Sequence, residues 1–465
     1  MAAPTGHRGG VGSGWLRGVP DDRPPDAIRS GVSLRAQVLS IVAVANHPFT
    51  PLRHRDVRLL WSAAVISDIG TWVQLIVVGS LVAGTTGSAV QTGLVALATF
   101  MPQGIASPIG GLLADRFDRR KVFAAALLVQ ALVTTGLAVV LAFGVESAGV
   151  LTAFILLASA AGATGAPSYS AMQPDLVPPH ELMAMISLGV YSWNGGRIVG
   201  PLLGAALALA VGPAWTVAFN ALTFVVMAGA VTLLRRPFVP KGDGGGTVRE
   251  RMLGGLRTMR TTPAIANGVL LVVLLNLVAI PFMGLMPIYA KALFDGGTGL
   301  AGSLATAQGI GAIVGGIAAT MLGPRLSRSS LVVVIMCGVA MSLTGFALAP
   351  TVPLAIVAVM PLGASVAASF VVIPAVIQRD APPESRGRVM SIMQASMGLS
   401  YGVGLLFIGS IGDAQNLRVA YSMGAILLLA GFAVIARVLP GWRAALDGEP
   451  APVATDGDVS LAAGQ

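Results

Sequence analysis

The sequence predicts an all-α integral membrane protein with twelve transmembrane helices. Of its 465 residues, 55% are hydrophobic and only 11% are charged, whereas a soluble domain carries about 25% charged residues. Its 59 glycines and 6% aromatic residues favour closely packed helices over a membrane barrel. The third observation is the spacing of the apolar segments, because a helix needs about 20 apolar residues to cross a bilayer.

Reading the chain with that window gives the twelve candidate spans in order. Each is bounded by polar, glycine-rich or proline-rich residues, and the fifth is long enough to be tilted or bent. The spans cover 58–83, 90–114, 121–144, 150–171, 183–211, 214–234, 266–290, 301–322, 330–349, 352–376, 389–411 and 418–439.

The positive charges test this count, because Lys and Arg accumulate in cytoplasmic loops. With the N-terminus inside, 26 of the 29 Lys and Arg residues fall on the cytoplasmic side. Lys291 and Arg418 fall on the other side, and Arg197 lies within span five. One missed span would scramble this asymmetry. We therefore expect a multi-pass cell-membrane protein with both termini cytoplasmic, whose net charge of +9 reflects topology and anionic lipid, with no nucleic-acid partner.

The chain divides into two six-helix halves. Residues 57–234 and 264–440 form the halves, and 235–263 form a basic cytoplasmic linker. The Gly-, Pro- and Arg-rich residues 1–56 and the tail 441–465 are predicted to be disordered. An internal repeat supports the division: an offset of 204 residues places Pro178-Pro179 on Pro382-Pro383 and Gly200 on Gly404. Such duplicated halves suit a transporter that rocks one half against the other around a midplane cavity.

The loop after span two carries a specific motif. Residues 110–121 read GGLLADRFDRRK, which resembles the loop 2-3 signature of the major facilitator superfamily. The matching positions are Gly111, Asp115, Arg116, Arg119 and Arg120, while Asp118 replaces the usual glycine. Two interpretations of this motif are compatible with each other. Asp115 suits a latch between the halves at the cytoplasmic gate, and the basic residues suit a positive-inside anchor.

A narrower resemblance covers most of residues 51–440. The stretches PLRHRDVRLLW at 51–61, TGSA at 86–89, PDLVP at 174–178 and RGRVMS at 386–391 are similar to the enterobactin-exporter-like branch, which also contains macrolide efflux proteins. The resemblance implies export of a small molecule driven by the proton gradient. It does not name the molecule.

Asp68 in span one and Arg197 in span five are the ionisable side chains clearly inside the membrane core. A charge there costs about 2.5 to 3.5 kcal/mol on insertion scales, so such residues face a cavity or one another. In the superfamily fold helices one and five are neighbours, so the resemblance implies that the two can pair. We hypothesise that Asp68 carries the coupling proton and Arg197 tunes it. A permanent structural ion pair is the alternative.

Span five contains GRIVGPLLG, which resembles the superfamily's exporter signature G-x-x-x-G-P-x-x-G. The matching residues are Gly196, Gly200, Pro201 and Gly204. Glycines four apart let another helix approach closely, and a proline bends the helix. The motif predicts a hinge of the exporter type, with ordinary small-residue packing as the alternative.

Polar and aromatic residues deep in the spans are candidates for the substrate cavity. Each alone is more often an interhelical hydrogen bond, and Met390, Met393 and Met397 on one helix face favour plain packing. A cavity with so little charge favours an apolar or amphipathic ligand. The candidates are Trp72, Gln74, Tyr191, Asn194, Asn276, Gln308 and Gln394.

Other functional classes fit poorly. The single Cys337 and the four histidines outside apolar segments indicate no metal site or other cofactor. None of the three lysines follows a glycine, as a phosphate-binding loop requires, and the loops are too short for an enzyme site. We expect a proton-coupled exporter, active as a monomer. A proton-coupled uptake symporter and a transport-inactive sensor or scaffold remain as alternatives.

Overall fold

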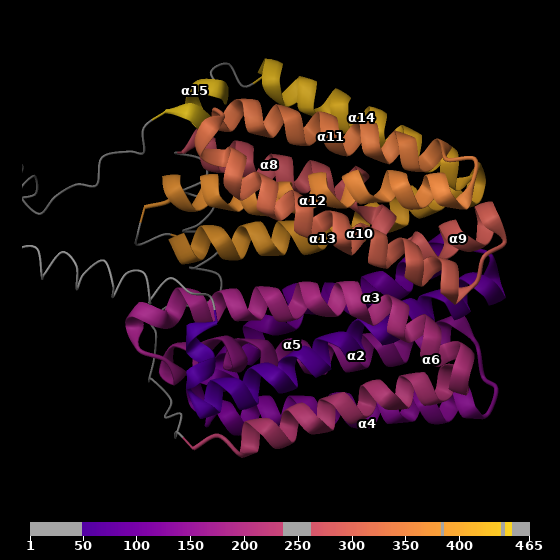
Figure 1. The fold of residues 1–465 in the computed structure, drawn as a ribbon, viewed down its shortest axis with the longest axis vertical. Coiled ribbons are helices and arrows are strands. Elements are labelled where there is room, and N and C mark those ends of the chain that lie inside the picture. The colour runs from indigo at the N-terminus through magenta and orange to yellow at the C-terminus, as the bar shows by residue number, and fades with distance from the viewer. Residues whose placement is uncertain (1–48, 236–261, 383–385, 439–441, 449–465) are drawn as a thin grey trace, which may run out of the picture.

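The computed structural model describes residues 49–235, 262–382, 386–438 and 442–448. These residues form two helical bundles that lie side by side (Figure 1). The first bundle contains α2 (Arg55–Thr86), α3 (Ala89–Arg116), α4 (Arg119–Ala142), α5 (Ala148–Leu176) and α6 (Leu182–Thr232). The second contains α8 (Pro263–Val278), α9 (Met286–Phe294), α10 (Thr298–Leu322), α11 (Arg328–Leu348), α12 (Val352–Asp380), α13 (Arg386–Ala414) and α14 (Leu417–Val438).

Among the described residues, nine helical segments are long and apolar enough to cross a membrane. One of them contains two crossings, because the backbone of α6 leaves the helical region at Gly212. The φ of Gly212 is 84°, which favours glycine, and Pro213 follows it. Adding the 28-residue α3 and the interrupted segment α8–α9 gives the twelve crossings that the sequence predicts.

The seventh span differs from the continuous helix predicted at 266–290. α8 ends at Val278, a 3₁₀ turn, η3, covers Ile280–Met283, and α9 begins at Met286. Pro281 and Pro287 explain the interruption, because proline has no amide hydrogen to donate and its ring clashes with the preceding turn. The break places Met283 and Gly284 beside the first bundle, where a Cβ at Gly284 would lie 2.6 Å from the Cβ of Ala96.

Side-chain caps set the start of several helices. Ser88 Oγ accepts a hydrogen bond from the Gln91 amide at 3.2 Å and begins α3. Asp118 Oδ1 accepts from the Arg120 amide at 2.9 Å and begins α4. Both bonds satisfy amide groups that a helix N-terminus leaves free. Asp118 is therefore a capping residue, although the family signature has glycine there.

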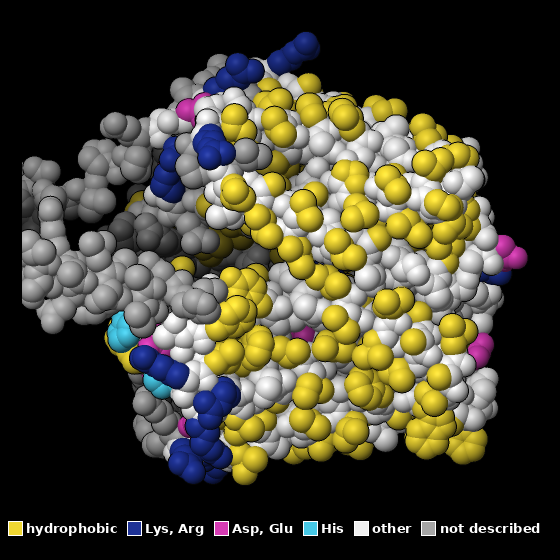
Figure 2. Space-filling model, viewed as in Figure 1, with side chains coloured by type: hydrophobic (Ala, Val, Ile, Leu, Met, Phe, Trp, Pro, Cys, Tyr) yellow, Lys and Arg dark blue, Asp and Glu magenta, His cyan; other side chains and the backbone are white. Residues whose placement is uncertain are grey.

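The interior of each bundle is apolar, and the second bundle has the larger core. There Tyr289 stacks on Phe346 with ring centroids 4.0 Å apart, and Tyr421 stacks on Phe346 at 6.0 Å. Met393 is buried in the same core, and Met390 and Met397 pack against it. The methionine face is thus packing, which is the favoured interpretation of that pattern. Apolar side chains also cover much of the outer surface (Figure 2), as lipid contact requires.

The tail prediction is wrong for its first residues. Trp442–Asp447 form a short helix, α15, in which Leu446 is buried. Asp447 Oδ1 accepts a hydrogen bond from the Ser329 amide of α11 at 2.9 Å, so the segment caps a neighbouring helix. The disorder predicted for 1–56 is also wrong at its end, where Thr50–Arg53 form the turn η1 and α2 begins at Arg55. Residues 1–48 and 449–465, and the linker residues 236–261, lie outside the described residues.

The two ends of the molecule differ in charge. The end where α2 begins carries Arg53, Arg58, Arg119, Arg120 and Lys121, and we call it the basic end. Blue side chains gather at this end in Figure 2, and a hollow opens there between the two bundles. We call the other end, where α2 ends and α3 begins, the opposite end.

Candidate functional site

The glycine motif of α6 fixes the helix pair at the centre of the first bundle. A Cβ added at Gly200 would lie 2.5 Å from the Cβ of Trp72 and 2.9 Å from the carbonyl oxygen of Ile69. A Cβ added at Gly196 would lie 2.8 Å from the α2 backbone, and one added at Gly204 would lie 3.0 Å from it. The motif therefore brings α6 against α2, and it sets the side chains of both helices around one centre.

Asp68 lies in the middle of α2 and is half-buried. Its carboxylate accepts a short hydrogen bond from the Ser192 hydroxyl of α6. Tyr169 of α5 is close enough to interact with it electrostatically. Every other acidic residue in the described helices lies within two residues of a helix end. Asp68 is thus the one acid at mid-depth in the part of the chain that the structure describes.

The predicted contact between Asp68 and Arg197 is absent, because Arg197 turns to the other bundle. Its Nε donates to Oε1 of Gln308 in α10 at 3.1 Å, and its Nη2 donates to the sulfur of Met283 at 3.6 Å. Its guanidinium carbon lies 6.0 Å from the ring centroid of Trp72, within range of a cation–π interaction. The two helices are neighbours as expected, but the side chains point to different partners.

Close packing between α6 and α10 explains the direction of Arg197. A Cβ at Gly302 would lie 2.6 Å from the carbonyl oxygen of Pro201. Thr306 Oγ1 donates to the carbonyl of Ile198 at 2.9 Å. Because α10 touches the same turn of α6 that carries Arg197, the amide of Gln308 is within reach of the guanidinium. Pro201, which belongs to the predicted hinge motif, thus lies at a contact between the halves.

Aromatic rings from both bundles surround this centre. Trp72 lies 5.3 Å from Trp193 and 6.4 Å from Phe100, measured between ring centroids. Phe100 in turn lies 5.9 Å from Tyr401 of α13. Sequence reasoning missed Trp193, Phe100, Tyr401 and the Met283 sulfur. A lone aromatic residue in an apolar span carries no signal that separates a cavity from ordinary packing.

Of the seven predicted cavity residues, only Trp72 and Gln308 lie at this centre. Gln74 is buried and accepts a hydrogen bond from Asn220 at 2.7 Å. The side chains of Asn194 and Asn276 donate to carbonyls of their own helices, at 2.9 Å each.

The remaining two cavity candidates are exposed. Gln394 lies on α13. Tyr191 contacts Phe49, with ring centroids 5.8 Å apart.

At the basic end, the signature residues divide into engaged and free groups. Arg119 is buried and binds Asp175 at 3.5 Å and the carbonyl of Ala171 at 3.2 Å, both in α5. Arg120 donates to the carbonyl of Leu234 at 2.8 Å, beyond the end of α6. Asp115 and the exposed Arg116 form no hydrogen bond or ion pair with the described residues. The latch therefore stays a prediction, and Gly111 has open space around it.

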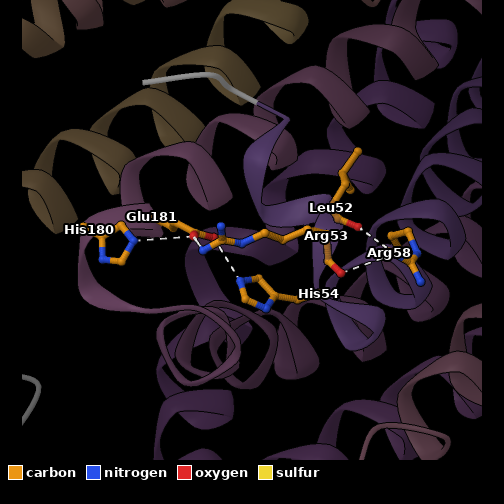
Figure 3. Close-up of polar contacts among 6 residues, drawn as sticks. All are labelled: Leu52, Arg53, His54, Arg58, His180 and Glu181. Atoms are coloured by element: carbon orange, nitrogen blue, oxygen red, sulfur yellow. Dashed lines mark hydrogen bonds and ion pairs between the residues drawn. The ribbon is translucent and has the colours of Figure 1, made fainter. Parts of the chain in front are cut away.

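A buried carboxylate also holds the start of α2 at the basic end. Glu181, in the turn η2 (Pro179–Glu181), has a side chain only 1% exposed. It accepts a short bond from Arg53 of the turn η1 (Thr50–Arg53) and lies 3.0 Å from His54 Nε2 and 3.5 Å from His180 Nε2 (Figure 3). Arg58 donates to the carbonyls of Leu52 and Arg53 in the same turn. This cluster ties η1 to the entry of α6.

At the opposite end, the two bundles are joined by Asp413 of α13. Its Oδ2 accepts a hydrogen bond from the Ser88 hydroxyl at 2.7 Å and another from the Val90 amide at 3.2 Å. Its Oδ1 accepts a short bond from the Ala89 amide. A carboxylate at a helix N-terminus is favourable because free amide groups and the helix dipole both point at it. The bundles are therefore in contact at this end, whereas Figure 2 shows a hollow between them at the basic end.

Comparison with known protein families identifies the family of this two-bundle chain. The model of the transmembrane secretion effector family matches residues 46–456. The chain belongs to this family of major facilitator transporters.

Several relatives of the chain are efflux proteins or exporters. The chain is 26% identical to the multidrug efflux pump Tap of Mycolicibacterium fortuitum, covering 85% of this chain and 98% of the relative. It is 24% identical to macrolide efflux protein A of Streptococcus pyogenes, covering 80% and 92%. It is also 24% identical to the enterobactin exporter EntS of Salmonella choleraesuis, covering 77% and 86%. The predicted branch is confirmed.

Solved structures of other transporters share the fold of this chain. The crystal structure of a D-xylose-proton symporter superposes with a TM-score of 0.65 at 16% identity, covering 82% of this chain and 96% of the symporter. The predicted major facilitator fold is thereby confirmed. At 16% identity this similarity shows only a shared fold.

Proposed function

We propose that this protein exports a small amphipathic molecule by proton antiport and alternating access. The observation that carries the proposal is Asp68, the one mid-depth acid of the described helices, which is half-buried and not neutralised by Arg197. A buried ionisable group without an opposite charge is the kind of residue that changes protonation in a transport cycle. The efflux relatives support the export direction.

The two ends of the molecule support alternating access. In the proposed orientation the basic end is cytoplasmic, following the positive-inside rule, and both termini lie on that side. Asp413 then closes the outer side, while the hollow of Figure 2 opens to the cytoplasm. This is the state that would take substrate from inside the cell. Closure of the cytoplasmic side would bring Asp115 to its partner across the halves.

Two alternatives predict different behaviour. An uptake symporter would use the same fold with the opposite coupling sign. A transport-inactive sensor has no need of a mid-depth acid or of close inter-bundle packing such as that of Thr306 on Ile198. These features and the efflux relatives favour export.

The direct test uses proteoliposomes that display the basic end outwards. With an acid lumen, the proposal predicts that at least one of three probes (ethidium, erythromycin and 2-naphthoate) accumulates in the lumen above its level in protein-free liposomes, with a matching excess alkalinisation reported by trapped pyranine. A protonophore should abolish the accumulation. Accumulation that needs an alkaline lumen would establish symport, and accumulation unaffected by the protonophore would exclude proton coupling.

A further inference from the structure

Three hydrogen-bond donors of the central cluster lack an acceptor that matches them. Among the described residues, Trp72 Nε1 and Gln308 Nε2 are buried without a hydrogen-bond partner. In the same part of the chain, the Arg197 guanidinium beside them has only the Gln308 oxygen and a thioether sulfur as acceptors. The three residues are 8%, 2% and 7% exposed. A cationic donor and two neutral donors are therefore buried on neighbouring side chains, with the Arg197 guanidinium carbon 6.0 Å from the Trp72 ring centroid and its Nε bonded to Gln308.

Such an arrangement is costly unless an acceptor completes it. A buried polar donor without a partner is destabilising, and a buried cation without an anion is more so. Within the described residues no acid lies within ion-pair distance of Arg197, and the carboxylate of Asp68 is held by Ser192. The described residues therefore supply no anionic acceptor for this cluster, and a bound ligand would complete it.

The geometry indicates what that acceptor is. A guanidinium presents parallel N–H groups that match the two oxygens of a carboxylate. The amide of Gln308 is held by its own oxygen on Arg197 Nε, at 3.1 Å, so its nitrogen remains beside the guanidinium as a further donor. The rings of Trp193, Phe100 and Tyr401 supply an apolar wall around this polar point.

We propose that Arg197, Gln308 and Trp72 bind the carboxylate of an aromatic or apolar acid, and that such acids are the substrate class of this exporter. The inference rests on the proposed function in one respect, namely that the central cluster receives the transported molecule. Because Arg197 and Trp72 belong to one bundle and Gln308 to the other, a bound carboxylate links both halves. Binding therefore acts on the interface that must rearrange in the transport cycle.

A matched pair of probes tests the charge directly. The affinities of 2-naphthoate and 2-naphthamide, which differ in the anionic group, are measured by titration calorimetry on the full-length protein in nanodiscs, in a buffer free of carboxylate salts. Hydrogen bonds to a charged group predict that naphthoate binds roughly 10- to 100-fold more tightly. Arg197→Gln should bring the two affinities within about threefold of each other. Arg437→Gln, an exposed arginine at the end of α14, should keep the preference.

Two milder variants keep the test valid if Arg197→Gln does not fold. Trp72→Phe retains the ring and removes one donor, and Gln308→Leu removes another, so each should reduce the preference roughly three- to tenfold. The exposed Gln415 provides the matched control Gln415→Leu. Equal affinities in the wild type, no binding of naphthoate, or a preference that survives these variants would overturn the inference. Calorimetry needs no proton gradient, so its result is independent of whether export is proton-coupled.

Discussion

Nε of Arg197 in α6 donates to Oε1 of Gln308 in α10 at 3.1 Å, and this bond crosses the interface between the two bundles. Both side chains are buried. A transporter that opens at its other end must separate or slide these helices, so the bond belongs to one state of the cycle. The central cation therefore takes part in holding the present conformation as well as in the proposed binding of substrate.

Loss of the Asp413 carboxylate should open the opposite end. Its bonds to Ser88, Ala89 and Val90 hold α13 against the start of α3. Asp413→Asn removes a charge-assisted contact worth about 1 to 2 kcal/mol, which shifts the equilibrium between states roughly 5- to 30-fold. Spin labels at Thr85 and Gln415 on a Cys337→Ser background should then report longer distances between the two labels by pulsed electron–electron double resonance.

Asp295 supplies the control for that experiment. It lies at the same end and is exposed, and its only described ion pair is with Lys291 at 2.6 Å. The hydrogen bond from Lys291 lowers the pKa of Asp295, so the group is a charged carboxylate without a contact between bundles. Asp295→Asn should leave the distances unchanged. An unchanged distribution in Asp413→Asn would show that this contact does not hold the end closed.

Asp115→Asn should slow switching while sparing substrate binding. The carboxylate forms no hydrogen bond or ion pair with the described residues, and a latch changes the rate of conformational change without touching the ligand. We expect turnover at saturating substrate to fall about tenfold, with half-saturation altered by less than about twofold. Asp118→Asn is the matched control, because asparagine can cap α4 as aspartate does. A collapse of affinity with normal turnover would refute the latch.

A side chain at Gly200 should force α2 and α6 apart. Its Cβ would lie 2.5 Å from the Cβ of Trp72 and 2.9 Å from the Ile69 oxygen. Overpacking of this kind costs about 1 to 3 kcal/mol, so Gly200→Val should lower the thermal unfolding temperature and impair transport. Gly189 of the same helix has nothing within 4 Å of its Cβ position, and Gly189→Val should be tolerated. Equal behaviour of the two variants would mean that the motif is not a packing device.

Glu181→Gln should loosen the basic end. The carboxylate is buried and binds Arg53 and His54, so its neutralisation weakens two charge-assisted contacts. Arg53 is half-exposed, which limits the loss to roughly 1 to 3 kcal/mol. Thermal unfolding of the detergent-solubilised protein should occur at lower temperature than in Glu146→Gln, where the glutamate is exposed. An identical unfolding temperature would argue that the cluster does not stabilise the fold.

Hydropathy and charge predict most of this fold, because the bilayer requires long apolar helices whatever their partners are. The break after Ala279 could have been inferred from Pro281 and Pro287, since both lie inside a predicted span. The helix α15 could not, because its six residues become ordered by the packing of Leu446 and the cap that Asp447 provides. Short segments of that kind carry no periodic signal.

The candidate site was predictable only in part. Arg197 and Gln308 stand out as polar residues in apolar spans, which is why both are among the predicted residues. The predicted partner of Arg197, Asp68, was wrong. Which side chain Arg197 reaches depends on how closely α10 approaches α6, and contacts between distant helices leave no local pattern. Glu181 and Asp413 were missed for the same reason. They lie at helix ends, where an acidic residue looks like ordinary surface.

The measurement that tests the account most directly is concentrative transport by Asp68→Asn. Proteoliposomes with the basic end outwards and an acid lumen are supplied with whichever probe the wild type accumulates, and Asp295→Asn serves as the control. Asp68→Asn should lose uphill accumulation, because an amide cannot carry the proton, while binding and downhill exchange of the probe persist. Accumulation by Asp68→Asn at the wild-type rate would contradict the account and exclude Asp68 as the proton carrier.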